Sequence, residues 1–260
     1  MKRIRYLFLG ILAACSGSSP APPADPPLPP PPPVTNESPG GVWSGTRPNG
    51  TDIIVLVGES GDMRIIDPFG NQGFGQLDVA NQTDITASYL LAPPFGGSLI
   101  DGSDAGSCDF AGTLAERQSM TYDVACTTSL GGAFGGTITL TYDPVYEMDS
   151  SLARVAGTWD VQGDVLVIDV NGALFLQSSQ TGCVWNGQVS LIDTEWNLYA
   201  MSATAENCQG PSAPLSGTSW DGLVSILLAP GAPQVEALVG GLSADVDGLP
   251  ASNVLGLPRI

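Results

Sequence analysis

The stretch GGVWSGTRPNGTDIIVLVGESGDMRII, residues 40–66, is matched in outline by AGTWDVQGDVLVIDVNGALFLQ, residues 156–177. Each begins with Gly-x-Trp, continues into an apolar segment rich in Val and Ile, and reaches a third apolar segment after a short Gly-containing turn. β-Branched segments separated by such turns are typical of β-hairpins. Because the pattern occurs twice, the sequence predicts two copies of one β unit.

Short segments of β-branched and aromatic residues, bounded by Gly, Asn, Asp or Pro, continue through both halves. The sequence therefore predicts an all-β fold with minimal helix, in which two related antiparallel β-meander halves form barrel-like or sandwich sheets. We expect repeat 1 over residues 41–145, and a connector with repeat 2 over residues 146–260. The connector contains a candidate for one or two helical turns, residues 146–157, with Ser150 or Ser151 as its N-cap.

Four cysteines lie in the two halves, and an even number in an exported chain favours disulfides. Cys108 in SCDFAGTL and Cys183 in GCVWNGQV share a Cys-x-aromatic-x-Gly pattern, and each precedes a second cysteine. This parallel predicts the bridges Cys108–Cys126 and Cys183–Cys208. A zinc site is the rival interpretation, but the cysteines lack close CxxC spacing and the chain has no histidine, so no metal site is expected.

Aligning the two halves on their cysteines leaves about 40 extra residues in the first half, between roughly residues 68 and 106. This segment includes GQLDVAN and DITASYLL, followed by a loop rich in Gly, Asp and Ser. We interpret it as a hairpin added to the first half.

The N-terminus, MKRIRYLFLGILAACSGSSP, has three basic residues before a short apolar run. That run is far below the roughly 20 residues of a membrane-spanning helix. It predicts a signal peptide over residues 1–14.

The motif Leu12-Ala13-Ala14-Cys15 resembles the lipobox of bacterial lipoproteins. The resemblance implies cleavage before Cys15, lipidation of Cys15 with acyl chains such as palmitate, and a stable membrane anchor. Since Ser16 follows the cysteine, the family further implies the outer membrane of a Gram-negative bacterium, with the folded part in the periplasm or at the cell surface. An ordinary secretory signal, with an incidental cysteine, is the alternative.

Residues 15–40 form a linker that has ten prolines between Pro20 and Pro33. Proline lacks an N–H donor and fixes φ, so this run is predicted to be an extended, semi-rigid stalk. A ligand for proline-binding grooves is the alternative.

The full chain has 26 acidic and 8 basic residues, a net charge of −18. Cleavage before Cys15 removes three basic residues and no acidic one, which leaves five arginines, no lysine and a net charge of −21. Such a chain repels phosphate groups, so no nucleic-acid partner is expected.

Gly41-Val42-Trp43 and Gly157-Thr158-Trp159 resemble the Gly-x-Trp that opens the first strand of lipocalins. The resemblance implies an eight-stranded up-and-down barrel whose bottom is closed by the tryptophan and whose mouth takes apolar ligands. Trp43 and Trp159 are thus expected in the cores of the two repeats. Two further lipocalin features, a Thr-Asp-Tyr turn and an arginine packed over the tryptophan, are not found at corresponding places.

The absence of histidine excludes Ser-His-Asp and Cys-His catalysis, and no phosphate-binding loop is found. We expect no cofactor, no catalytic residue and no enzymatic activity. The residues weighed for a carboxylate hydrolase are Asp160, Asp164, Asp169, Glu195 and Asp221. Two acidic loops, DGSDAG at 101–106 and DVDG at 245–248, lack the terminal glutamate of an EF-hand and are interpreted as surface loops.

These observations together predict a membrane-anchored lipoprotein of the cell envelope. The first functional hypothesis is a non-enzymatic binding or structural module for an envelope protein or a glycan. The second is a lipocalin-like carrier of a small apolar ligand, and the weakest is a carboxylate-dependent hydrolase.

Overall fold

The computed structural model describes residues 35–229 and 232–260. The signal peptide, Cys15 and the proline run lie outside the described residues. The described part is all-β, as the sequence predicts, and consists of two eight-stranded antiparallel sheets.

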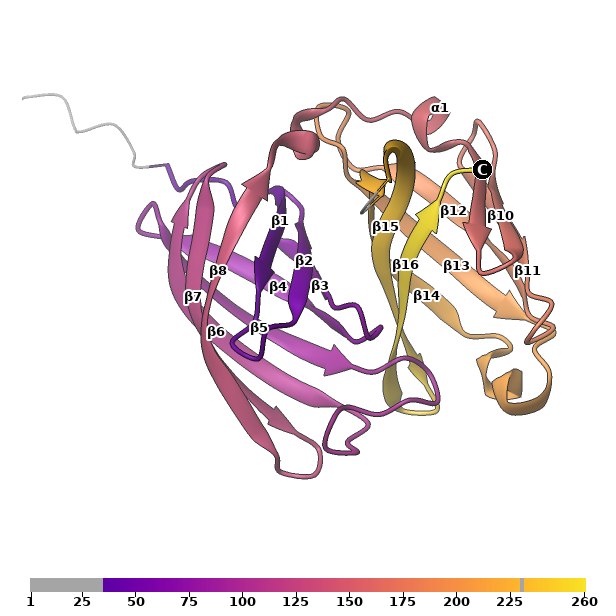
Figure 1. Cartoon of the computed structure of the whole chain (residues 1–260), viewed down its shortest axis with the longest axis horizontal. Helices are drawn as coiled ribbons and strands as arrows, with labels where there is room; N and C mark the ends of the chain where they lie inside the picture. Colours follow the sequence, from indigo (N-terminus) through magenta and orange to yellow (C-terminus); the bar gives the residue numbers. More distant parts are fainter. Residues whose placement is uncertain (1–34, 230–231) are drawn as a thin grey trace, which may run out of the picture. The chain divides into compact units, whose positions relative to one another are not determined.

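The first sheet is a closed barrel in which every strand pairs with its neighbours in sequence, and β1 also pairs with β8 (Figure 1). Trp43 in β1 lies opposite Val55 of β2 and Tyr142 of β8. Closure leaves the barrel without an unpaired edge. The strands are β1 (Gly41–Thr46), β2 (Asp52–Val57), β3 (Asp62–Ile66), β4 (Gln72–Ala80), β5 (Asp84–Ala92), β6 (Gly106–Ala115), β7 (Ser119–Thr128) and β8 (Ala133–Asp143).

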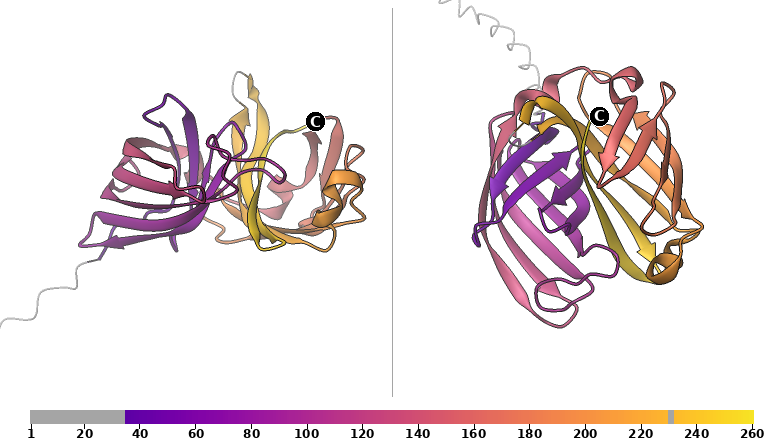
Figure 2. Two further views of the ribbon diagram at one scale, coloured as in Figure 1. Left: turned by 90° about the horizontal axis from the view of Figure 1, so that it is seen from below. Right: turned by 45° about the vertical axis from the view of Figure 1, so that its right-hand side comes forward.

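The second sheet has the same consecutive strand order but remains a half-barrel (Figure 2). Its two ends meet only at the end of the chain, where Arg259 forms a bridge with Trp159 and the Ile260 amide donates to the Thr158 carbonyl at 3.1 Å. The strands are β9 (Gly157–Val161), β10 (Asp164–Ile168), β11 (Ala173–Gln177), β12 (Val184–Leu191), β13 (Tyr199–Glu206), β14 (Ser219–Ala229), β15 (Ala232–Val246) and β16 (Leu249–Pro258).

Within residues 35–229 and 232–260, helix is confined to three short segments: η1 (Pro144–Glu147), α1 (Leu152–Val155) and η2 (Gly210–Leu215). Of these, α1 lies within residues 146–157, where the sequence predicts one or two turns, and η1 begins two residues before that segment. Ser151 is the N-cap of α1, and its side chain accepts a hydrogen bond from the Arg154 amide.

The core has three parts within the compact unit Val34–Ile260. One fills the barrel, and a second fills the concave side of the half-barrel. A third joins the two sheets, because apolar residues on the outside of β1–β3 pack against β14–β16; it includes Val42, Leu56, Leu223 and Val239. The two repeats thus share a buried apolar interface.

The structure forms both predicted disulfides, but the two bridges do not occupy equivalent strands. Cys108–Cys126 joins β6 to β7, the sixth and seventh strands of the barrel, with the two cysteines directly opposite each other. Cys183–Cys208 joins the start of β12 to the end of β13, the fourth and fifth strands of the half-barrel. The alignment of the repeats on their cysteines is therefore wrong.

The segment between residues 68 and 106 does contain the expected hairpin, β4 and β5, followed by the Gly-Asp-Ser-rich loop. It is not an addition, however, since the half-barrel also has eight strands. In the half-barrel the corresponding two strands are the hairpin β15–β16, which follows Cys208 instead of preceding Cys183.

Candidate functional site

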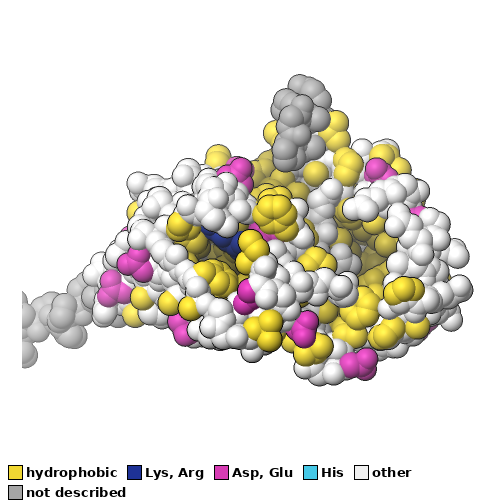
Figure 3. Space-filling model, turned by 60° about the horizontal axis from the view of Figure 1, so that its bottom comes forward, with side chains coloured by type: hydrophobic (Ala, Val, Ile, Leu, Met, Phe, Trp, Pro, Cys, Tyr) yellow, Lys and Arg dark blue, Asp and Glu magenta, His cyan; other side chains and the backbone are white. Residues whose placement is uncertain are grey.

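A cavity of about 390 Å³ opens inside the barrel at the end formed by the β1–β2, β3–β4, β5–β6 and β7–β8 loops. We call it the first cup. Its wall consists of alternate residues that face inward from the strands, including Leu91 of β5, Val124 of β7 and Ile138 of β8. Figure 3 shows hollowed regions lined by apolar side chains, with basic atoms recessed in one of them.

An ion pair lies at the mouth of the first cup. The Arg47 guanidinium donates through Nη1 to Oδ2 of Asp67 at 3.0 Å. The Asp67 side chain is only 1% exposed, whereas that of Arg47 is 22% exposed. Residues 43, 45 and 47 alternate along β1 and the residue that follows it, so they share one face. This face points into the barrel, where it buries Trp43 and places Arg47 in the lining of the first cup.

Asp67 has further hydrogen-bond donors that stabilise its buried charge. Its Oδ1 accepts from the amides of Phe69 at 2.9 Å and Asn71 at 3.0 Å, and its Oδ2 accepts from Asn71 Nδ2 at 3.0 Å. These bonds close the β3–β4 loop on the carboxylate. A buried carboxylate with four donors is satisfied, which fixes the loop beside the mouth.

The wall also contains the hydroxyl of Tyr89, which lies 3.8 Å from Sγ of Cys126. Burial raises the pKa of Tyr89 to about 12, while the positive charge of Arg47 acts in the opposite direction. Burial likewise raises the pKa of Tyr122, and Arg47 again opposes the shift. Both tyrosines therefore stay protonated at neutral pH, Tyr89 in the wall of the cup and Tyr122 in the barrel core.

Exposed apolar side chains from the loops and strand ends surround the mouth of the first cup. Phe69 in the β3–β4 loop is 72% exposed, and Phe134 at the start of β8 is 47% exposed. Ile100, in the β5–β6 loop, is also exposed, and all three line the cavity. Large apolar groups at the entrance of a concave site are typical of ligand binding.

A second cavity, of about 430 Å³, lies on the concave side of the half-barrel; we call it the second cup. Its apolar wall includes Leu176, Trp185 and Leu255, and its lining carries Asp160 and Asp164 but no basic residue. Because this sheet is not closed, the second cup has an incomplete wall.

Trp43 and Trp159 are fully buried in the two repeats, and their environments match. Each indole Nε1 donates at 3.2 Å to the carbonyl four residues earlier, that of Pro39 or Val155. Buried tryptophans require such an acceptor.

An arginine does pack over one of these tryptophans, which corrects the expectation from sequence. The Arg259 guanidinium lies 4.3 Å from the Trp159 ring centroid and donates to the carbonyls of Ala156 and Arg154. The equivalent position beside Trp43 is held by Tyr142, whose ring meets the indole edge-on at 5.2 Å. Arg259 was missed because it follows the last strand, where no apolar pattern marks it.

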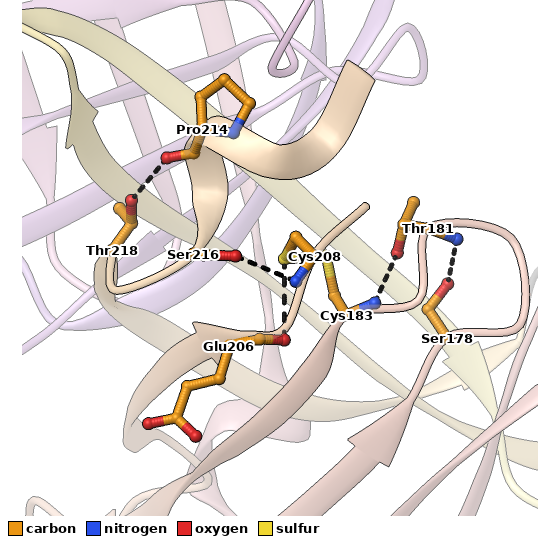
Figure 4. The surroundings of a disulfide bond; sticks show 8 residues. All are labelled: Ser178, Thr181, Cys183, Glu206, Cys208, Pro214, Ser216 and Thr218. Carbon is orange, nitrogen blue, oxygen red and sulfur yellow. Dashed lines mark hydrogen bonds between the residues drawn. A yellow bond between two sulfur atoms is a disulfide. The ribbon is translucent and has the colours of Figure 1, made fainter. Parts of the chain in front are cut away.

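The backbone amides of both cysteines in the second disulfide donate hydrogen bonds to nearby side chains (Figure 4). The Cys208 amide donates to Ser216 Oγ at 2.9 Å, and the Cys183 amide donates to Thr181 Oγ1 at 3.3 Å. Cys183 lines the second cup, as Cys126 lines the first. Each disulfide thus braces the wall of one cup.

Of the five carboxylates weighed for hydrolysis, only Asp160 and Asp164 are brought to one cavity. Asp160 accepts from the Gly163 amide, and Asp164 accepts from the Ser179 amide. Hydrogen bonds from Ser179 lower the pKa of Asp164, whereas a general acid for glycoside hydrolysis needs a raised pKa. Asp164 therefore lacks the raised pKa that a general acid needs.

Both acidic loops use their carboxylates in local hydrogen bonds. Asp101 accepts from Thr128 Oγ1 at 2.5 Å and from the Ser103 amide at 3.0 Å, which lowers the Asp101 pKa. Asp245 accepts from the Gly248 amide at 2.7 Å and closes the β15–β16 turn. Within residues 35–229 and 232–260, no group of three or more His, Cys, Asp or Glu side chains is placed to hold a metal ion.

No helix in the described part of the chain has the length and hydropathy to cross a membrane. No protein-family model matches the chain, and no curated protein matches its sequence. Among solved structures, the chain is similar to Aeromonas veronii immune modulator A, with 12% identity and a TM-score of 0.41 over 87% of this chain and 95% of that one.

Proposed function

We propose that this protein is a non-enzymatic binding protein of the cell envelope, which holds a small, mainly apolar ligand in the first cup. A β-barrel fold suits a binding module. The observation that carries the proposal is a closed barrel with a cavity of about 390 Å³, apolar walls and one cluster of polar groups at its mouth. Ligand pockets typically have volumes of about 300–1,000 Å³ and this distribution of polar and apolar groups.

The first cup is preferred over the second because all its sides are closed by paired strands. A closed wall removes more of a ligand's apolar surface from water, and each Å² so buried contributes about 25 cal/mol.

Native mass spectrometry tests this proposal on protein isolated from its own host's envelope without denaturation. We expect a retained small molecule, released when the protein is unfolded. A chain that carries Cys15→Ser avoids detergent, which would itself compete for an apolar cup.

Blocking variants then locate the site. The neutral fluorescent probe N-phenyl-1-naphthylamine is titrated into the Cys15→Ser chain, into the same chain with Val124→Trp, and into the same chain with Leu176→Trp. Val124 lines the first cup and Leu176 lines the second. Binding lost only with Val124→Trp supports the proposal, and binding lost only with Leu176→Trp transfers it to the second cup. No binding by the starting chain would reject a carrier role.

The envelope location is proposed from the lipobox and from the disulfides, which favour a compartment outside the cytoplasm. Cys15→Ser is expected to move the protein from the membrane fraction to the soluble fraction of lysed cells. Continued sedimentation with membranes would contradict an anchor at Cys15.

One observation favours a second candidate, an interaction with another envelope protein. Val165, Val167 and Phe175 are each more than 40% exposed on the outer face of β10 and β11, and Val167 lies directly opposite Phe175. An exposed apolar strip of this kind is typical of a binding surface. Val167→Asp is expected to abolish a cross-link formed in intact cells, while Val170→Asp, at an exposed turn position, leaves it unchanged. Equal cross-linking by both variants would rule out the strip.

A further inference from the structure

Arg47 is the single basic residue that lines either cup within the described residues. It donates one hydrogen bond, through Nη1 to Asp67, and its remaining side-chain N–H groups have no partner among the described residues. A guanidinium has five donors, arranged so that two of them can bind one carboxylate. Part of this donor set is therefore available at the mouth of the first cup.

The Asp67 carboxylate has hydrogen-bond donors other than Arg47. Three donors from Phe69 and Asn71 satisfy Asp67 without the arginine. Arg47 can accordingly share its charge with a second acceptor without leaving a buried carboxylate unsatisfied.

The electrostatics of the mouth limit how much negative charge a ligand can bring. Asp101 also lines this mouth, and its hydrogen bonds to Thr128 and Ser103 keep it ionised. Cleavage before Cys15 would leave a net charge of −21 on the chain. This field repels polyanions, whereas one charge held at contact distance by a partly buried guanidinium is favoured locally.

We infer that the ligand of the first cup is an amphiphile with one apolar tail and one anionic head group, such as a long-chain carboxylate. The head accepts hydrogen bonds from Arg47 at the mouth, and the tail lies between Leu91, Val124 and Ile138. This inference rests on the proposed function and specifies its ligand class.

The test compares two fluorescent probes that have the same polyene tail, cis-parinaric acid and its methyl ester, on the Cys15→Ser chain. We expect the acid to bind about tenfold more tightly than the ester, the gain expected from a charge-assisted hydrogen bond worth about 1.4 kcal/mol. Arg47→Gln should reduce the affinity for the acid to that for the ester and leave the ester unchanged. Arg47→Lys, which keeps the charge but not the planar fork, should fall between the two.

The matched control is Arg154→Gln, which removes the same charge from a half-buried side chain of α1, remote from the first cup. It should leave both affinities unchanged. Thermal unfolding of each variant verifies that it is folded.

Three outcomes would overturn the inference. Equal binding of acid and ester by the starting chain, or equal weakening of both by Arg47→Gln, would mean that the cup takes neutral ligands and the proposed function survives. Binding of neither probe would reject the proposed function itself.

Discussion

The two buried tryptophans have the same geometry, with each indole bound to a carbonyl four residues earlier, but different covering groups. Arg259 covers Trp159 and Tyr142 covers Trp43. One edge of β9 pairs with no full strand. Next to this edge, the Arg259 guanidinium donates hydrogen bonds to the carbonyls of Ala156 and Arg154. The Arg259 side chain therefore reinforces the backbone contacts by which the end of the chain meets β9.

Arg259→Gln is expected to destabilise the protein by about 2–4 kcal/mol, because it removes a cation–π contact and two charged hydrogen bonds. Chemical denaturation followed by tryptophan fluorescence measures the change. Arg154→Gln is the control and should cost about 1 kcal/mol or less, because the half-buried Arg154 side chain donates to a single carbonyl, that of Asp149. Equal effects would contradict a closing role for Arg259.

Tyr89 makes stability depend on pH in the alkaline range. Its pKa is about 12 in the folded state, against 10.0 for a free tyrosine. Between these values the folded state retains a proton that the unfolded state has lost, so the free energy of unfolding falls as pH rises from 10 to 12.

Tyr89→Phe should show a smaller fall than the parent over this window, in denaturation experiments at several pH values. Absorbance titration of the parent should contain a group near pH 12 that the variant lacks. Loss of a group titrating near pH 10 instead would contradict burial of this hydroxyl.

The Gly-x-Trp motif, through its resemblance to lipocalins, predicted the burial of both tryptophans, and the alternation of strand residues places Arg47 on the same inward face of β1. Arg47 escaped notice because TRPNGTD has the composition of an exposed turn. Asp67 and Tyr89 could not be assigned to one site, since 20 and 42 residues separate them from Arg47 and only barrel closure brings them together.

At the scale of elements, the composition of the sequence predicted the strands and hairpins, but it did not predict which strands of the two repeats correspond. The motif Cys-x-aromatic-x-Gly occurs in β6 and at the start of β12, which are the sixth and fourth strands of their sheets. Inward and outward side chains alternate in every strand, so many strands have similar sequences. A short motif therefore does not identify which strand of the sheet carries it. Tryptophan position, with its indole acceptor, identifies equivalent strands more reliably.

The two disulfides close loops of similar size, with sequence separations of 18 and 25. Loop-closure entropy then predicts a stabilisation of about 3 kcal/mol from each. Replacing either pair by alanine should lower the urea midpoint by a similar amount, measured without reductant.

The parent protein in reductant should lose both contributions together and match the quadruple variant. A reduced parent that keeps its full stability would show that neither bridge constrains the unfolded chain.

At the scale of the whole described unit, an aromatic cluster links the two sheets. Trp196, before β13, stacks on Tyr146 of η1 with ring centroids 5.3 Å apart, and Arg117 lies 4.1 Å from the Trp196 ring centroid. Together with the apolar interface, this contact predicts that barrel and half-barrel unfold in one transition.

Trp196→Ala is expected to lower stability by about 1–3 kcal/mol and to separate unfolding into two transitions in calorimetry. Trp185→Ala is the matched control, since Trp185 contacts Trp220 within the half-barrel alone. It should lower stability without separating the two transitions. A single transition in both variants would mean that the apolar interface suffices.

The residues that precede β1 are fastened to the end of the barrel opposite the first cup. Asn36 and Glu37 make hydrogen bonds to the β4–β5 turn, and Glu37 also accepts from the amide of Glu116 in the β6–β7 turn. The described chain therefore begins at the end of the barrel opposite the first cup.

The strict up-and-down order of the barrel also has an evolutionary consequence. The loops at residues 47–51, 67–71 and 129–132 all lie at the mouth, while the Trp43 core lies toward the other end. Two loops at this mouth are tied to the half-barrel: the Pro93 carbonyl of the β5–β6 loop accepts from the Ser252 amide, and the Gly70 carbonyl of the β3–β4 loop accepts from Ser252 Oγ at 2.9 Å. The β1–β2 and β7–β8 loops can therefore diverge, or be randomised in a library, at less risk to folding than the two loops that contact the half-barrel.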